Sequence, residues 1–105
     1  MRPEHVHNFG TFFVTTQTWE RRPLFRAEQL AQLFLHVLYM YAAQKKYLLH
    51  EFVVMLDHVH LIITPNGITL ERAMQLIKGG YSRALSKASR PNLGIWQRGF
   101  PHSRL

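Results

Sequence analysis

The chain has 105 residues, enough for one domain with a single modest core. Its 47% hydrophobic and 18% charged residues are typical of a globular protein and exclude a disordered one. The absence of cysteine excludes disulfides and thiolate metal sites and favours a cytoplasmic location, while a net charge of +7 predicts a polyanionic partner.

The first half of the chain predicts a strand followed by a long helix. Residues 1–10 are polar and without periodicity, so we expect a loose arm there. Residues 11–17 are rich in β-branched and aromatic side chains, which predicts a first strand. After a polar loop, residues 27–46 repeat apolar side chains at intervals of three and four, which predicts a helix with one buried stripe: Leu30, Leu33, Phe34, Val37, Leu38 and Tyr41.

The middle of the chain predicts a hairpin and a second helix. Strands are expected at 48–55 and 58–64, and the two residues between them predict a tight antiparallel turn. Thr69 is a typical helix cap. The helix that follows has its own buried stripe, namely Leu70, Ala73, Met74, Ile77, Tyr81, Ala84 and Leu85. Gly79 and Gly80 inside it each cost about 1 kcal/mol relative to alanine, which indicates that another group comes close to the backbone there.

The remaining residues predict a last strand and complete the fold. The helix is expected to end at 90–92, a fourth strand to cover 93–98, and residues 99–105 to form an irregular tail. The order strand, helix, strand, strand, helix, strand predicts a single α+β domain over 1–105 with the ferredoxin-like βαββαβ arrangement. In that arrangement both helices cover one face of an antiparallel sheet and leave the other face open.

Two histidines, His58 and His60, begin the third predicted strand. Side chains alternate along a strand, so these two imidazoles point the same way, with Cβ atoms roughly 7 Å apart. At that separation both can converge on one metal ion. The alternative is a pair of solvated histidines without a role. The apolar run continues to Ile63, which indicates an interior strand and favours a metal site on the open face of the sheet.

Positive charge gathers in the second half of the chain. Seven Lys and Arg follow Thr69 against the single acid Glu71: Arg72, Lys78, Arg83, Lys87, Arg90, Arg98 and Arg104. This distribution is the electrostatic footprint of a nucleic-acid-binding protein, although a merely soluble basic face would give the same pattern. We expect cations to contact DNA phosphates and Trp96 to stack on an unpaired base, so the predicted DNA-binding residues are Lys78, Arg83, Lys87, Trp96 and Arg98. A core position for Trp96 is the alternative.

Residues 52–61 resemble the HUH motif (histidine, hydrophobic residue, histidine) of the single-tyrosine transposases of the insertion-sequence type. Within that family the chain is most similar to the REP-associated tyrosine transposases. The resemblance extends in the same order to residues 13–16, 68–70, 74–81 and 95–100 and so covers nearly the whole chain. It implies a ferredoxin-like catalytic fold that recognises hairpin DNA and cleaves and joins single strands.

The resemblance also implies the chemistry of the site. The two HUH histidines, with a third polar ligand, would hold a divalent ion, Mg²⁺ or Mn²⁺, against the scissile phosphate. A tyrosine would attack to give a 5′-phosphotyrosine, and members of the family commonly pair as dimers. In the family that tyrosine follows the region matched by residues 95–100, and no residue here corresponds to it, so a C-terminally truncated chain with weak or absent cleavage is expected. His102 is a candidate for the third ligand.

Two other functions stay open at this level. One is a non-catalytic module that binds single-stranded nucleic acid on its open sheet face, a mode that uses two or three exposed aromatic residues. The other is a small metal-dependent hydrolase, which the basic second half of the chain disfavours. No apolar run reaches the roughly 18 residues that span a bilayer, so no membrane partner is expected. A truncated enzyme, a decayed remnant and a repurposed DNA-binding protein would share these features.

Overall fold

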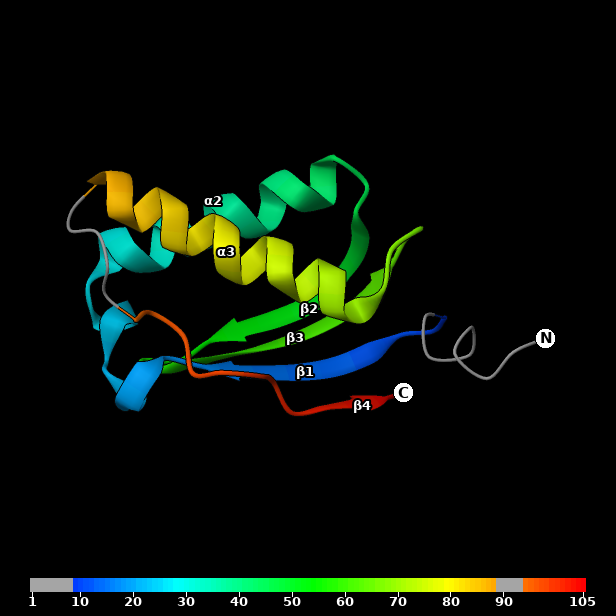
Figure 1. Cartoon of the computed structure of the whole chain (residues 1–105), viewed down its shortest axis with the longest axis horizontal. Helices are drawn as coiled ribbons and strands as arrows, with labels where there is room; N and C mark the ends of the chain where they lie inside the picture. Colours follow the sequence, from blue (N-terminus) through cyan, green and yellow to red (C-terminus); the bar gives the residue numbers. More distant parts are fainter. Residues whose placement is uncertain (1–8, 89–93) are drawn as a thin grey trace.

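The structure is a computed structural model of the whole chain and describes residues 9–88 and 94–105. Two helices lie on one face of a four-stranded sheet, as Figure 1 shows, and the opposite face is uncovered. The elements are β1 (Phe12–Gln17), two short 3-10 turns η1 (Trp19–Arg21) and η2 (Leu24–Arg26), α2 (Glu28–Ala43), β2 (Tyr47–Val54), β3 (His58–Pro65), α3 (Leu70–Ala88) and β4 (His102–Arg104).

The strand order is β2-β3-β1-β4, and every pair of neighbours is antiparallel. This confirms the predicted α+β fold with both helices on one face. β3 is an interior strand, paired with β2 on one side and β1 on the other, so its outward side chains lie at the centre of the open face. The predicted arm at 1–10 lies mostly outside the described residues.

The core lies between the sheet and the two helices. Val59, Leu61 and Ile63 of β3 are completely buried, as predicted, and face the apolar stripes of α2 and α3. Tyr81 of α3 is equally buried, and its hydroxyl donates to the carbonyl of Leu30 in the first turn of α2. This bond ties the two helices together inside the apolar layer.

The helix α2 ends three residues earlier than the sequence predicts. The chain turns at Lys45, which has a φ of +65°, and the amide of Lys46 donates to the carbonyl of Tyr41. This is the usual left-handed termination of a helix, here made by a lysine in place of the more common glycine. The sequence predicted too long a helix because cations are favourable at a helix C-terminus, so Lys45 and Lys46 were included in it.

Two features of α3 were predicted correctly. The hydroxyl of Thr69 accepts a hydrogen bond from the amide of Arg72 at 2.9 Å, which caps the helix. A Cβ added at Gly80 would lie 2.9 Å from a ring carbon of Tyr41, so α2 makes the close approach that the glycine pair indicated. The predicted end of this helix at 90–92 falls outside the described residues.

Of the predicted fourth strand over 93–98, residue 93 lies outside the described residues and the rest forms only a short bridge, while the predicted irregular tail contains the regular strand β4. Trp96 makes an isolated bridge with Thr18, and the regular strand β4 begins only at His102, opposite Val14. Val14 and Thr18 are four residues apart, whereas their partners His102 and Trp96 are six residues apart. The last segment therefore has two extra residues between the two pairings. The chain bulges at 98–100, where Gly99 has a φ of +76°. We call this segment the edge bulge.

Candidate metal and nucleic-acid sites

His58 and His60 lie on the open face of the sheet, on the side away from both helices. Their ring centroids are 4.8 Å apart and the two ring planes are nearly perpendicular, at 79°. Both side chains are partly buried, because each is flanked across the sheet by residues of the neighbouring strands. Phe13 of β1 stacks on the His60 ring at 5.4 Å and limits its movement on that side. The two rings thus sit side by side in a supported position.

Each imidazole has its Nδ1 atom held by a neighbouring polar group. The Nδ1 of His58 lies 2.7 Å from a carboxylate oxygen of Asp57, and the Nδ1 of His60 lies 2.9 Å from the hydroxyl of Thr15. A carboxylate can only accept, so Nδ1 of His58 carries the proton and its Nε2 keeps a free lone pair in the neutral ring. Metal-binding histidines are commonly oriented by this kind of bond.

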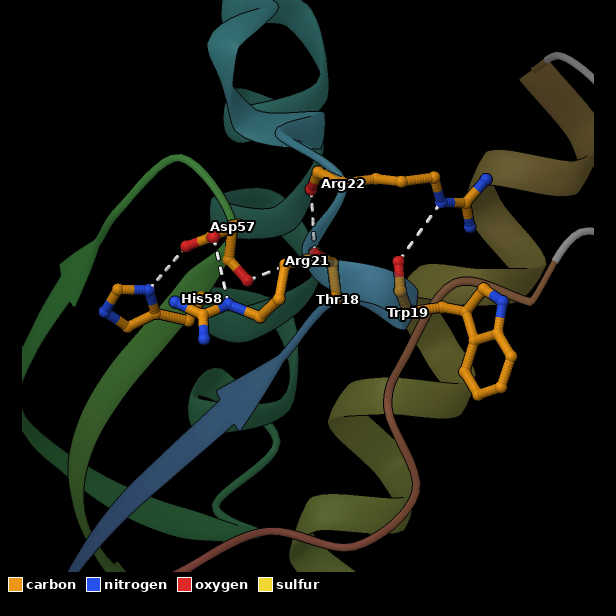
Figure 2. Close-up of polar contacts among 6 residues, drawn as sticks. All are labelled: Thr18, Trp19, Arg21, Arg22, Asp57 and His58. Carbon is orange, nitrogen blue, oxygen red and sulfur yellow. Dashed lines mark hydrogen bonds and ion pairs between the residues drawn. The ribbon is translucent and has the colours of Figure 1, made fainter.

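Asp57 is itself held by the loop that follows β1, which Figure 2 shows. The Nε atom of Arg21 donates to the second carboxylate oxygen of Asp57 at 3.0 Å. The hydrogen bond from His58 is the main cause that holds the pKa of Asp57 below its usual value; burial opposes it, and the hydrogen bond and positive charge of Arg21 add to the lowering. The carboxylate therefore stays ionised and keeps accepting from both partners at neutral pH.

The spacing of the two rings fits a shared ion. Two imidazoles on one metal have ring centres roughly 4.5–5.3 Å apart, for metal–nitrogen bonds of about 2.1 Å, and the pair here is within that range. Over residues 9–88 and 94–105, however, no three His, Cys, Asp or Glu side chains gather closely enough to form a complete protein cage. A two-histidine site of this kind leaves several positions of an ion open to other ligands.

His102, the candidate third ligand, points away from the pair. It lies opposite Val14 in the β1–β4 pairing, and its ring contacts that of Phe12 at 6.4 Å. Both of these neighbours are buried on the helix side of the sheet. His102 therefore lies on the opposite face from His58 and His60, and the expectation that it reaches their ion is wrong.

A separate cleft of about 780 Å³ opens between α3 and the edge bulge. It is lined by both charged and apolar side chains, among them Arg72, Lys78, Trp96, Arg98 and Phe100. The ammonium group of Lys78 donates to the carbonyls of Gln97 and Gly99 at 3.0 and 2.9 Å, and burial lowers its pKa. Lys78 therefore fastens the edge bulge to α3, a structural role that the sequence did not indicate.

The other four predicted DNA-binding residues have different surroundings. Trp96 donates its indole N–H to the carbonyl of Lys78 and packs its ring against Phe25, Phe34 and Tyr81, so most of the side chain belongs to the core. Arg98 is exposed on the edge bulge. Arg83 and Lys87 are exposed on α3. At 100° per residue, their directions around the helix axis differ from that of Lys78 by roughly 140° and 180°.

The structure does not bring these residues together with the two histidines. α3 packs on one face of the sheet and the His58–His60 pair is on the other, so the sheet itself separates them. The residues that support the pair, namely Thr15, Arg21 and Asp57, were not predicted from the sequence. Asp57 directly precedes His58, and that adjacency was the one available signal. Arg21 and Thr15 lie more than 30 residues away, and only the fold brings them close.

The family model of the transposases described as IS200-like matches residues 5–104. The chain belongs to this transposase family. The match spans β1, the histidine pair, α3 and β4, so the resemblance seen in the separate motifs extends over the whole fold. No curated protein matches the chain.

Two solved structures share the fold of this transposase-family chain. One is a REP-associated tyrosine transposase bound to a REP hairpin, with a TM-score of 0.75 and 24% identity over 93% of this chain. The other is a candidate transposase from Deinococcus radiodurans R1, with a TM-score of 0.68 and 18% identity over 90% of this chain. The chain spans 57% of the length of the first and 78% of the second. Within the described residues no helix has the length and apolar character to cross a bilayer.

Proposed function

We propose that this transposase-family domain binds single-stranded or hairpin DNA and holds a divalent ion, Mg²⁺ or Mn²⁺, between His58 and His60. The observation that carries the proposal is the arrangement of the two rings on an interior strand, 4.8 Å apart, each with its Nδ1 held and its Nε2 available. When bound, the ion would act as a Lewis acid on a phosphate oxygen and fix the position of the DNA backbone. The hairpin in the structure of the REP-associated relative supports DNA as the partner.

The chain's own residues would then divide the work. The carboxylate of Asp57 and the hydroxyl of Thr15 orient the imidazoles, and Phe13 covers one side of the His60 ring. Exposed cations, Arg98 at the edge bulge and Arg83 and Lys87 on α3, would contact the phosphates of flanking DNA. Lys78 would act there through the edge bulge that it fastens, and the rim of Trp96 facing the cleft would be its contact with a base.

We also propose that none of the four tyrosines in this sequence is the attacking nucleophile. Tyr47 and Tyr81 are buried, and burial raises the pKa of Tyr81 to about 12, which makes its phenolate scarce at neutral pH. Tyr39 and Tyr41 belong to α2, on the far side of the sheet from the histidines. Metal binding, DNA binding and weak or absent strand cleavage are therefore the combined expectation for this chain.

The metal site is tested by isothermal titration calorimetry, in which Mn²⁺ is added to the wild type and to the His58→Ala and His60→Ala variants. Each variant is expected to lose at least about tenfold in affinity, because each removes one of two protein ligands. His36→Ala is the matched control, since it removes an exposed histidine from α2 on the other face. Unchanged Mn²⁺ binding in both site variants would remove the metal-site proposal.

The nature of the nucleic acid is tested by binding at several salt concentrations. Hairpin DNA with a single-stranded flank, duplex DNA and RNA of matched length are compared by fluorescence anisotropy. The proposal expects the DNA hairpin to bind most tightly and its affinity to fall steeply with salt, as phosphate contacts require. A preference for RNA would favour a non-catalytic nucleic-acid-binding module instead.

A further inference from the structure

The loop after β1 has an unusual backbone for its sequence. Glu20 and Arg21 are consecutive residues with φ values of +54° and +56°, in the left-handed region that favours glycine. A non-glycine residue there costs roughly 1–2 kcal/mol. Two such residues in succession persist only where the surrounding structure holds them, and strain of this kind clusters at functional sites.

Several bonds hold the loop in place, as Figure 2 shows. The hydroxyl of Thr18 lies 2.8 Å from the carbonyl of Arg22 and 3.1 Å from that of Asp57, and shares its proton between them. The amide of Thr18 also donates to the Asp57 carbonyl at 2.9 Å. The guanidinium of Arg22 donates to the carbonyls of Trp19 and Gly94. The loop is thus fastened both to the turn that carries Asp57 and to the last segment of the chain.

The strained backbone brings Arg21 to the histidine pair. Its Nε atom bonds to one oxygen of the Asp57 carboxylate, and His58 bonds to the other oxygen. The guanidinium and the imidazole therefore flank the same carboxylate. The Arg21 side chain is 57% exposed, so its two Nη groups stay accessible while Nε is engaged. The cations of α3, by contrast, belong to a helix that covers the other face of the sheet.

We propose that Arg21 is a phosphate-binding residue of the His58–His60 site, an inference that rests on the function proposed above. A guanidinium has five donors in a planar fork, and the two Nη groups left free can grip one phosphate group of a DNA strand lying over the histidines. Arg21 also neutralises Asp57, so that the carboxylate that orients His58 does not repel the incoming phosphate. The strain at positions 20 and 21 is the cost of this placement.

The test uses Arg21→Gly, which both removes the guanidinium and relieves the left-handed strain at position 21. We expect its melting temperature to equal or exceed that of the wild type. Its affinity for a single-stranded oligonucleotide is expected to fall about tenfold, with a salt slope lower by about one. Its Mn²⁺ affinity should stay within about threefold of the wild type, because the two histidines remain.

Two further variants separate charge from structure. Arg26→Ala removes an exposed arginine from η2 with the same loss of charge, and is expected to bind the oligonucleotide within about twofold of the wild type. Arg21→Gln keeps a donor for Asp57 without the charge, and should bind as weakly as Arg21→Gly.

Equal binding by Arg21→Gly and Arg26→Ala would overturn the inference about Arg21 while leaving the metal site intact. Retention of Mn²⁺ binding without the histidines would instead remove the proposed function. The two failures are therefore distinguishable.

Discussion

Thr16 and Thr18 show how much a single hydroxyl can matter in this fold. Both residues are fully buried on or next to β1. The hydroxyl of Thr18 has two carbonyl acceptors, whereas that of Thr16 has no hydrogen-bond partner among the described residues. A buried polar group without a partner lowers stability by about 1–3 kcal/mol.

The two threonines therefore predict opposite effects for the same substitution. Thr16→Val replaces an unpaired hydroxyl with a methyl group of similar size, and is expected to raise the free energy of unfolding by about 1 kcal/mol. Thr18→Val leaves the loop without its hydroxyl bond, and is expected to lower it by about 1–3 kcal/mol. Urea denaturation of both variants measures the difference, and a loss of stability in Thr16→Val would show that its hydroxyl is paired.

The sequence predicted single residues well where alternation or periodicity decides their direction. The shared side of His58 and His60 and the burial of Val59, Leu61 and Ile63 follow from the two-residue period of a strand. The roles of Arg21 and Lys78 do not follow from any such pattern. Each depends on a partner in another part of the chain, 36 residues away for Arg21, and side-chain bonds of that kind leave no periodic trace.

At the scale of elements, the paired glycines of α3 offer a direct comparison. A Cβ at Gly80 would meet the buried ring of Tyr41 at 2.9 Å and Val37 at 3.1 Å, whereas at Gly79 the nearest atom is a flexible end of Arg83 at 3.5 Å. Gly79→Ala is expected to gain about 1 kcal/mol of stability, as alanine does inside a helix. Gly80→Ala is expected to lose about 1–3 kcal/mol through crowding between α2 and α3.

Thermal unfolding of the two glycine variants, followed by circular dichroism, checks this expectation. A stabilised Gly80→Ala would mean that α2 shifts freely, which the bond between Tyr81 and the Leu30 carbonyl opposes. The sequence indicated that some group approaches the glycines. It could not identify α2 as that group, because the packing of two helices depends on both surfaces at once.

The fourth strand marks the limit of prediction at this scale. Residues 93–98 have the composition of a strand, and Trp96 does pair with Thr18. The edge bulge then shifts the register by two residues and moves β4 to His102–Arg104. Lys78 supports this bulge by donating to the carbonyls of Gln97 and Gly99, and this contact comes from a helix rather than from the strand itself.

For the whole molecule, the sheet lies between the histidine pair, which is on its open face, and the helix α3 that carries several cations. We therefore expect metal binding and flanking DNA binding to be separable by mutation. Arg98→Ala should weaken binding of hairpin DNA uniformly across sequences, by about threefold to tenfold, and lower the salt slope by about one. Its Mn²⁺ affinity should match that of the wild type, because Arg98 lies away from the open face.

Anisotropy and calorimetry on the same Arg98→Ala preparation test this separation, with Glu71→Gln as a control that changes charge in the opposite direction at the rim of the same cleft. A drop in Mn²⁺ affinity together with DNA affinity would contradict it. Charge counting alone predicted a nucleic-acid partner. It could not show that the positive residues fall on two sides of the sheet, because that depends on the order of the strands.

The edge bulge has one more consequence, for contact between separate copies of the chain. A sheet border with a long row of unpaired backbone amides is a template on which another strand can add. In the edge bulge that precedes β4, the carbonyls of Gln97 and Gly99 already accept hydrogen bonds from Lys78. We therefore expect Lys78 to hinder the addition of a strand from a second copy of the chain at the edge bulge.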